Sequence, residues 1–300
     1  MSLVENGAPE AEALLDRIYG KKPAAPRVGI TGPPGAGKST LVAEYALLLR
    51  REGRRVGVVA VDPTSPFTGG AILGDRVRMS ELSTDPDVFI RSMATRGSLG
   101  GLAGRTEELC ELLSGWGSDV TLIETVGVGQ SELDVAQAAD TTLVVLTPES
   151  GDAIQSLKAG LMEIADVFVV NKSDHSGADQ LTAAIRSALA LRPPAPWRPP
   201  IVRTIATQRA GIEELHQAIQ SHGAHLKEPG ALATIRREKI RARLKTAVRE
   251  RLLERAWDRQ GLGALLDRAA EQVLQGAVSP YRAARDLIER MTDHGERSPN

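Results

Sequence analysis

The chain has little cysteine, few aromatic side chains and almost no net charge, and each scarcity excludes a kind of chemistry. Cys110 is the only cysteine in 300 residues, so one chain can form neither an internal disulfide nor a cysteine-based zinc site. Only 3% of residues are aromatic, which argues against stacking platforms for single-stranded nucleic acid. The formal net charge of −1 gives no reason to expect nucleic acid or an anionic membrane as partner.

Long apolar runs and a recognisable leader are also missing. No apolar run approaches the roughly 18 residues that a membrane-spanning helix needs. The first residues, MSLVENGAPEAEALL, contain early acids and lack the basic segment of a signal peptide. We therefore expect a cytoplasmic protein with no membrane and no nucleic-acid partner. The setting of Cys110, TEELCELL, predicts a helix in which the thiol is a small buried group.

From residue 27 onward, short apolar runs alternate with helical patterns. Runs rich in β-branched residues predict seven strands: RVGI, RVGVVAV, DVFIRSM, DVTLIET, TTLVVLT, DVFVVN and IVRTIA. Helices are predicted between most of them, as in STLVAEYALLLRREG. Continuous apolar strands separated by helices predict an α/β fold with a mainly parallel, doubly wound sheet that is covered on both faces.

The composition changes at both ends of this alternation. We expect a short N-terminal helical extension over residues 1–26, the α/β domain over 27–222, and a C-terminal helical dimerisation arm over 223–300. In the arm, Ser279 and Pro280 are predicted to begin a helix as N-cap and first helical residue.

One predicted helix of the arm carries an apolar stripe between basic faces. Its apolar residues are four apart: Ile240, Leu244, Val248 and Leu252. A basic face is most often a solvated surface; a dimer or docking contact comes second, and a nucleic-acid contact last.

A glycine-rich segment follows the first predicted strand and leads into a helix. VGITGPPGAGKSTL contains the spacing G-x-x-x-x-G-K-S, and this context predicts a P-loop. Glycines let backbone N–H groups approach phosphate oxygens, and the helix N-terminus adds its positive end. Lys38 would reach the terminal phosphates, and the Ser39 hydroxyl would ligate Mg²⁺. The predicted phosphate-binding residues are Gly32, Pro33, Pro34, Gly35, Ala36, Gly37, Lys38, Ser39 and Thr40.

Two further candidate residues follow another apolar strand, in DVTLIETVGVGQ. Glu124 ends this strand, where a carboxylate could hold Mg²⁺ or its waters. Gly127 lacks a side chain and could bring its N–H to the γ-phosphate.

The segment VFVVNKSD predicts recognition of guanine. The Asp174 carboxylate can accept two hydrogen bonds from the guanine edge, and adenine lacks that donor pair. Asn171 belongs to the same motif, and the stem of Lys172 can cover the base plane. Ala206 and Thr207 end the last strand, and their backbone could contact the base oxygen. Together with the P-loop, these residues predict a protein that binds GTP or GDP.

The stretch AVDPTSPFTGGAILGDRVRM is too long and too polar for an ordinary connector. It runs from Asp62, at the end of a predicted strand, to Asp75. Beside a nucleotide site, such a segment is typical of a switch that orders when the γ-phosphate is present. The two aspartates could order metal-bound waters or position the attacking water.

These segments, with FIRSMATRGSLGGLA, GDAIQSLKAGLMEIADVFVVNKSD and SPYRAA, resemble the MeaB/ArgK family. These P-loop GTPases belong to the metalloenzyme-assisting group and are associated with methylmalonyl-CoA mutase. The resemblance covers residues 27–288. It implies a homodimeric, Mg²⁺-dependent GTPase that acts as chaperone of an adenosylcobalamin-dependent acyl-CoA mutase. Such a protein hydrolyses GTP to gate cofactor loading and to protect or reactivate the mutase.

The resemblance also implies roles for particular residues. A catalytic and metal-binding group would be formed by Lys38, Ser39, Asp62, Asp75 and Glu124. A third switch would contain Asp152 and Lys158, which would relay the nucleotide state to the partner.

Two other functions remain open: a metallochaperone GTPase of the nickel-delivery type, and a protein kinase acting on an amino-acid transport system. His216, His222 and His225 could be read as a metal cluster, but histidines scattered near a linker are more often at the surface. His-rich tracts and cysteine metal motifs are absent. The guanine motif argues against ATP, and no acceptor site for a phosphorylated protein is visible.

Overall fold

The chain divides into two units, Met1–Lys239 and Ile240–Asn300. A computed structural model describes residues 1–5, 9–19, 25–62, 82–94, 101–125, 131–149, 160–227, 234, 237–238, 240–242, 244–245, 247–249, 251–252 and 262–293. For some of these residues, including Asp62, the structure describes the backbone alone.

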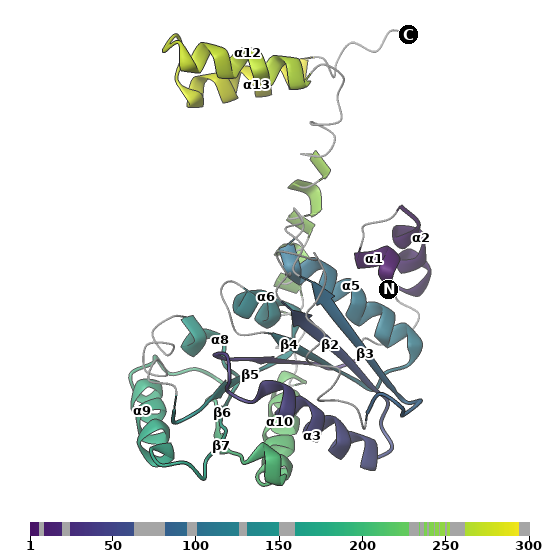
Figure 1. Ribbon diagram of the computed structural model, residues 1–300, viewed down its shortest axis with the longest axis vertical. Coiled ribbons are helices and arrows are strands. Elements are labelled where there is room, and N and C mark those ends of the chain that lie inside the picture. The colour runs from purple at the N-terminus through teal and green to yellow at the C-terminus, as the bar shows by residue number, and fades with distance from the viewer. Residues whose placement is uncertain are drawn as a thin grey trace. The chain divides into compact units, whose positions relative to one another are not determined.

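A seven-stranded sheet forms the centre of the first unit (Figure 1). Its order is β3-β2-β4-β1-β5-β6-β7, and every neighbouring pair is parallel. The strands are β1 (Arg27–Thr31), β2 (Val56–Asp62), β3 (Val88–Ala94), β4 (Val120–Thr125), β5 (Thr141–Leu146), β6 (Val167–Val170) and β7 (Ile201–Arg203). The prediction of a parallel, doubly wound sheet is confirmed, and each of the seven predicted runs overlaps one strand.

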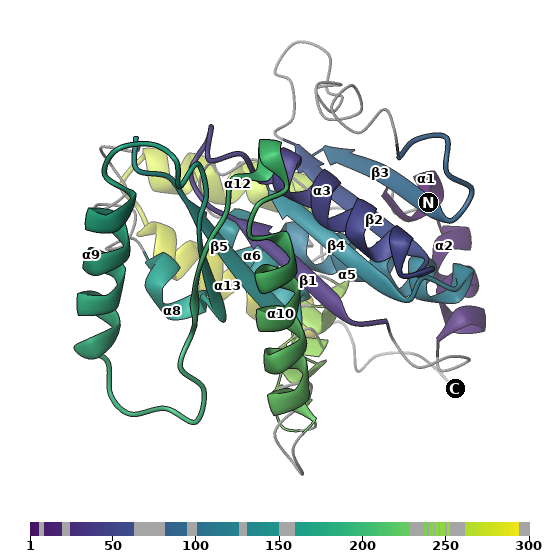
Figure 2. The same ribbon diagram turned by 90° about the horizontal axis from the view of Figure 1, so that it is seen from below.

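Helices cover both faces of this sheet. The first unit contains α1 (Ser2–Glu5), α2 (Pro9–Ile18), α3 (Lys38–Arg51), α5 (Gly101–Trp116), α6 (Ser131–Ala138), α8 (Met162–Ile164), α9 (Ala178–Ala190), the short 3₁₀ helix η2 (Ala206–Gln208) and α10 (Ile212–Leu226). One face is covered by α3 and α10, and the other by α5 and α6 (Figures 1 and 2). The N-terminal helices α1 and α2 pack against α5.

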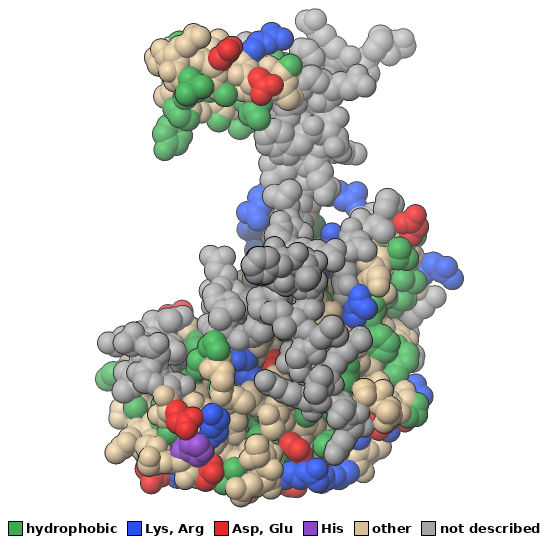
Figure 3. Space-filling model, viewed as in Figure 1, with side chains coloured by type: hydrophobic (Ala, Val, Ile, Leu, Met, Phe, Trp, Pro, Cys, Tyr) green, Lys and Arg blue, Asp and Glu red, His purple; other side chains and the backbone are tan. Residues whose placement is uncertain are grey.

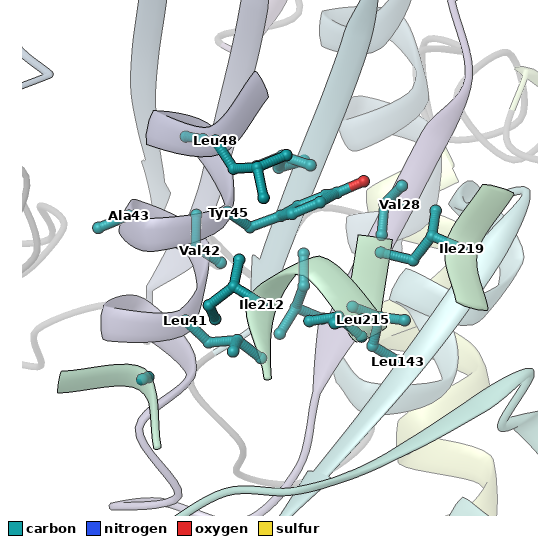
Figure 4. Packing of buried hydrophobic residues seen from close by; sticks show 14 of the residues in the cluster. Val28, Leu41, Val42, Ala43, Tyr45, Leu48, Leu143, Ile212, Leu215 and Ile219 are labelled. Carbon is teal, nitrogen blue, oxygen red and sulfur yellow. The ribbon is translucent and has the colours of Figure 1, made fainter. Parts of the chain in front are cut away.

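The alternation of side chains along β2 explains how one strand serves both layers. Val56 and Val58 enter the apolar cluster under α3 and α10, whereas Val59 and Val61 enter the cluster under α5 and α6. Successive strand side chains point to opposite faces, so a strand that is apolar throughout is buried on both. Figure 4 shows Tyr45 of α3 in the first cluster, with its hydroxyl end near Val28 and Ile219.

The helix α10 places two histidines inside the first unit. His216 and His222 are buried, so the expectation of surface histidines was wrong for both. The reason is the helical spacing from Leu215 to Leu226, which puts both imidazoles on the face that packs against the sheet. His225 is half-buried, and its ring stacks on that of Trp197.

The end of α10 can be compared with the predicted boundary between the α/β domain and the arm. The helix passes through the predicted boundary between residues 222 and 223 and ends at Leu226. The division into extension, α/β domain and arm stays a prediction.

The second unit contains the helical pair α12 (Leu262–Leu274) and α13 (Pro280–Asp293), which pack together. The predicted start of α13 is confirmed, because the Arg282 N–H donates to Ser279 Oγ at 3.3 Å and Pro280 is the first helical residue. The stripe residues Ile240, Leu244, Val248 and Leu252 are exposed by 48%, 60%, 57% and 62%.

Surface chemistry agrees with the balanced composition. Charged side chains of both signs are interspersed over the face of the first unit seen in Figure 3. In the part of the chain that the structure describes, no helix combines the length and the apolar character needed to cross a membrane.

Candidate nucleotide-binding site

The loop over residues 32–37 joins β1 to α3 and depends on its glycines. Gly32, Gly35 and Gly37 have φ angles of 139°, 75° and 84°, a region that residues with a side chain seldom adopt. A Cβ on Gly32 would collide with the backbone of Val145, and one on Gly37 would collide with the side-chain amide of Asn171. Glycine is therefore required at both positions by conformation and by space.

The first turn of α3 brings a cation and a hydroxyl to this loop. Lys38 Nζ donates to the carbonyl oxygens of Gly32 at 2.8 Å and Pro33 at 3.0 Å, and the lysine is buried. These contacts hold the ammonium group against the loop, beside the N-terminus of α3. The positive end of the helix dipole and the lysine charge make this a favourable position for phosphate oxygens.

Glu124 lies beside the same helix turn. Its Oε1 accepts a hydrogen bond of 2.5 Å from Ser39 Oγ, and both residues are buried. The sheet register explains the meeting, because Glu124 lies next to Ile30 of β1 and Ala60 of β2, near the carboxyl ends of all three strands. Hydroxyl and carboxylate oxygens are ligands that Mg²⁺ accepts, so this pair could hold the metal. Asp62 is the last residue of β2, at the same edge of the sheet.

Asn171 connects the guanine motif to the P-loop. Its Nδ2 donates to the Ala36 carbonyl oxygen at 2.9 Å, and its Oδ1 accepts from Thr204 Oγ1 at 3.0 Å and from the Ala206 N–H at 3.2 Å. The side chain therefore acts as a brace between three segments. The Ala206 N–H, a predicted base contact, is engaged by this brace. Thr207 is exposed in η2.

Next to the brace, Lys172 and His175 both contact Glu149. Lys172 Nζ is 3.0 Å from Glu149 Oε2, and His175 Nδ1 is 2.7 Å from Glu149 Oε1. The hydrogen bond from Lys172, followed by that from His175, holds the pKa of Glu149 below its usual range. Lys172 has a φ of 53°, and Asp174 is exposed beside it. Two of the predicted base-binding residues, Lys172 and Asp174, thus lie in the segment after β6, and neither is buried.

Some predicted site residues fall outside the described part of the chain. Asp75, Gly127, Asp152 and Lys158 lie outside the described residues, as does the side chain of Asp62. Their roles stay predictions. By contrast, the structure brings together Lys38, Ser39, Glu124 and Asn171.

Two contributors were missed from the sequence. Thr204 directly follows β7 and donates a hydrogen bond to Asn171. Glu149 follows β5 and accepts a hydrogen bond from Lys172. Both are polar residues that come soon after an apolar strand, and this position was the available signal. Cys110, in contrast, is as predicted: it is buried in α5, and burial raises the pKa of its thiol to about 12.

A glycine loop between a parallel strand and a helix, with lysine and serine in the first helical turn, defines a P-loop nucleotide-binding protein. The family model described as methylmalonyl Co-A mutase-associated GTPase MeaB matches residues 1–261. The chain belongs to this family and is a GTPase.

Named relatives agree with this assignment. A protein of Pyrococcus horikoshii, provisionally named a GTPase, is 47% identical over 97% of this chain and 92% of its own. The GTPase ArgK of Escherichia coli is 37% identical over 96% of this chain and 90% of its own. A crystal structure described as an LAO/AO transport system kinase is 31% identical, with a TM-score of 0.73 over 97% of this chain and 91% of that one.

Proposed function

We propose that this GTPase is the chaperone of an adenosylcobalamin-dependent acyl-CoA mutase of the methylmalonyl-CoA mutase type. In this function, GTP hydrolysis gates loading of the cofactor and protects or reactivates the mutase. The observation that carries the proposal is the match of residues 1–261 to a family described by its association with that mutase. The assignment of the mutase as partner rests on membership of this family, because the described site residues are those that bind a nucleotide.

We propose further that hydrolysis depends on Mg²⁺. The donor set supports this: Ser39 and Glu124 place a hydroxyl and a carboxylate 2.5 Å apart at the P-loop. Asp62, and with it Asp75, would complete the group. When bound, the metal would neutralise charge on the β- and γ-phosphates.

The residues of this chain would contribute mainly by positioning. Lys38 supplies a fixed positive charge at the loop, and the glycine N–H groups orient the phosphates for in-line attack by water. Residues 62–75 and the segment with Asp152 and Lys158 are proposed as switches that report the γ-phosphate. The described residue that supports the first switch is Asp62, because it ends β2 at the same edge of the sheet as the nucleotide site.

The test is GTP hydrolysis by the purified protein, with and without a purified cobalamin-dependent acyl-CoA mutase. We expect the mutase to raise the turnover severalfold and to form a complex whose affinity depends on the nucleotide. Replacing Mg²⁺ by EDTA should abolish turnover in both arms. The Lys38→Ala variant controls for contaminating GTPases and should stay inactive with the mutase present. If the mutase neither stimulates turnover nor forms a complex, the mutase assignment is contradicted. Full turnover in EDTA would contradict the dependence on Mg²⁺.

A second candidate is a protein kinase of a transport system, because the similar solved structure carries that description. Hydrolysis and kinase activity differ in the acceptor of the γ-phosphoryl group. With γ-labelled GTP, a hydrolase releases the label as inorganic phosphate. Stable transfer of the label to a protein of an amino-acid transport system would favour the kinase.

A further inference from the structure

A pocket of about 330 Å³ lies at the edge of the first unit, away from the P-loop. It is formed between the end of α9, the amino end of β7 and the proline-rich segment 191–200 that connects them. Parallel strands present the same end at the same edge. The nucleotide-site residues follow the carboxyl ends of β1 and β6, whereas Ile201 begins β7. The pocket is therefore at the opposite edge of the sheet.

The walls of this pocket are positively charged. Arg186, Arg192 and Arg198 line it, and no aspartate or glutamate is among the described residues that do so. Within the described part of the chain, Arg186 and Arg198 make no ion pair. Arg192 is held by a 3.0 Å hydrogen bond from its guanidinium to the Met162 carbonyl oxygen of α8. Three guanidinium groups without a carboxylate favour an anion, because they offer charge-assisted and bidentate hydrogen bonds.

A fixed aromatic side chain forms another wall. Trp197 Nε1 donates to the Asp166 carbonyl oxygen at 2.8 Å. Its ring centroid lies 4.8 Å from that of His222 and 5.3 Å from that of His225. Prolines restrict the backbone on both sides of it, at Pro193 and Pro199. A wall that is rigid before binding loses little conformational entropy when a ligand arrives.

The size and the remaining walls indicate an organic ligand. Leu189, Ala190 and the prolines add apolar surface, and the volume lies in the range of small-molecule sites. We propose that this pocket, lined by Arg186, Arg192, Arg198 and Trp197, binds a small organic polyanion, either a phosphorylated or a polycarboxylated metabolite. Because this pocket is separate from the P-loop, the protein can bind the ligand and the guanine nucleotide at the same time.

Two probes distinguish the two sources of negative charge: fructose 1,6-bisphosphate for phosphates and tricarballylate for carboxylates. Each is titrated by calorimetry into protein saturated with GDP, so that the P-loop is occupied, at constant ionic strength. The indole N–H resonance of Trp197 gives a local readout. We expect saturable binding of at least one probe, with a dissociation constant in the micromolar to millimolar range and a shifted Trp197 resonance.

The variant Arg186→Gln/Arg198→Gln should weaken binding of that probe by about tenfold or more. Arg186 and Arg198 are both exposed, so the melting temperature and the GDP affinity of the double variant should match those of the wild type. Arg51→Gln removes an exposed arginine at the end of α3 and should bind the probe normally. The absence of saturable binding by either probe, or equal binding by wild type and double variant, would overturn the proposal. This outcome does not depend on the mutase assay.

Discussion

At the scale of single residues, Asn171 couples parts of the nucleotide site that are distant in sequence. It is 2% exposed and bonds to the P-loop at Ala36 and to the segment after β7 at Thr204 and Ala206. Buried polar atoms are costly when they lose their partners, by about 1–3 kcal/mol for each group. The conformation of the P-loop should therefore depend on a side chain of the base-recognition motif.

Gly37→Ala tests this coupling. The new methyl group would collide with the Asn171 amide, in a backbone conformation of φ 84° that alanine already disfavours. We expect GDP affinity to fall by about tenfold or more, together with a lower melting temperature. Fluorescent-GDP titration and a thermal melt without nucleotide measure the two effects.

Gly53→Ala is the matched control. Gly53 has a similar φ of 75°, but a Cβ there would meet open space. It should cost about 1–2 kcal/mol of stability through the backbone alone and leave GDP affinity unchanged. Equal loss of GDP affinity in both variants would show that strain, and not the contact with Asn171, controls the loop.

The sequence predicted the residues whose chemistry is local. Lys38 and Ser39 follow the glycine spacing, and Glu124 ends a strand beside them, so motif and position were sufficient. The bracing role of Asn171 depends on Ala36, 135 residues away, and on which strands are neighbours. Pairing across such distances is not encoded in any short pattern, which is also why Thr204 and Glu149 were missed.

At the scale of elements, the strands could be predicted because continuous apolar runs between turn residues are a local property of the sequence. The face that α10 buries was misjudged. Leu215, His216, Ile219 and His222 share one helical face, and an apolar stripe was readable there. Histidine is compatible with either environment. Its burial is decided by partners on other elements, such as Tyr45 and Thr141.

His216 makes the stability of this element depend on pH. Burial lowers its pKa, and Arg54 acts in the same direction while Glu52 opposes it. The unfolded chain takes up the proton near pH 6.5, before the folded chain does. Stability from the neutral imidazole is therefore present above that pH and is lost as the pH falls below it. We expect the melting temperature of the wild type to fall between about pH 7.5 and 5.5.

His216→Gln should flatten this dependence while lowering the melting temperature at neutral pH, because the contact with Tyr45 is altered. His175→Gln removes an exposed histidine and should keep the wild-type slope. Melts with saturating GDP at each pH measure both variants. A slope of His216→Gln as steep as that of the wild type would assign the pH dependence to other groups.

At the scale of the whole molecule, the described residues of the second unit include many exposed large apolar side chains. Besides the stripe at Ile240, Leu244, Val248 and Leu252, large hydrophobic side chains are exposed on α12 and α13. Contiguous exposed apolar surface marks an interaction site. We propose that this unit forms the dimer contact, with a second copy of the chain as its partner.

Leu244→Lys/Leu252→Lys should convert the dimer to a monomer, because each change places a charge in the apolar stripe. Light scattering at micromolar concentration should give twice 32.0 kDa for the wild type and 32.0 kDa for the variant. Leu191→Lys is the control: this leucine is 88% exposed on the first unit, and its replacement should leave the mass unchanged. GDP affinity should be equal in all three proteins, since the P-loop belongs to the first unit. A monomeric wild type would show that the chain forms no dimer under these conditions. A variant that stays dimeric would show that the dimer contact lies outside the stripe.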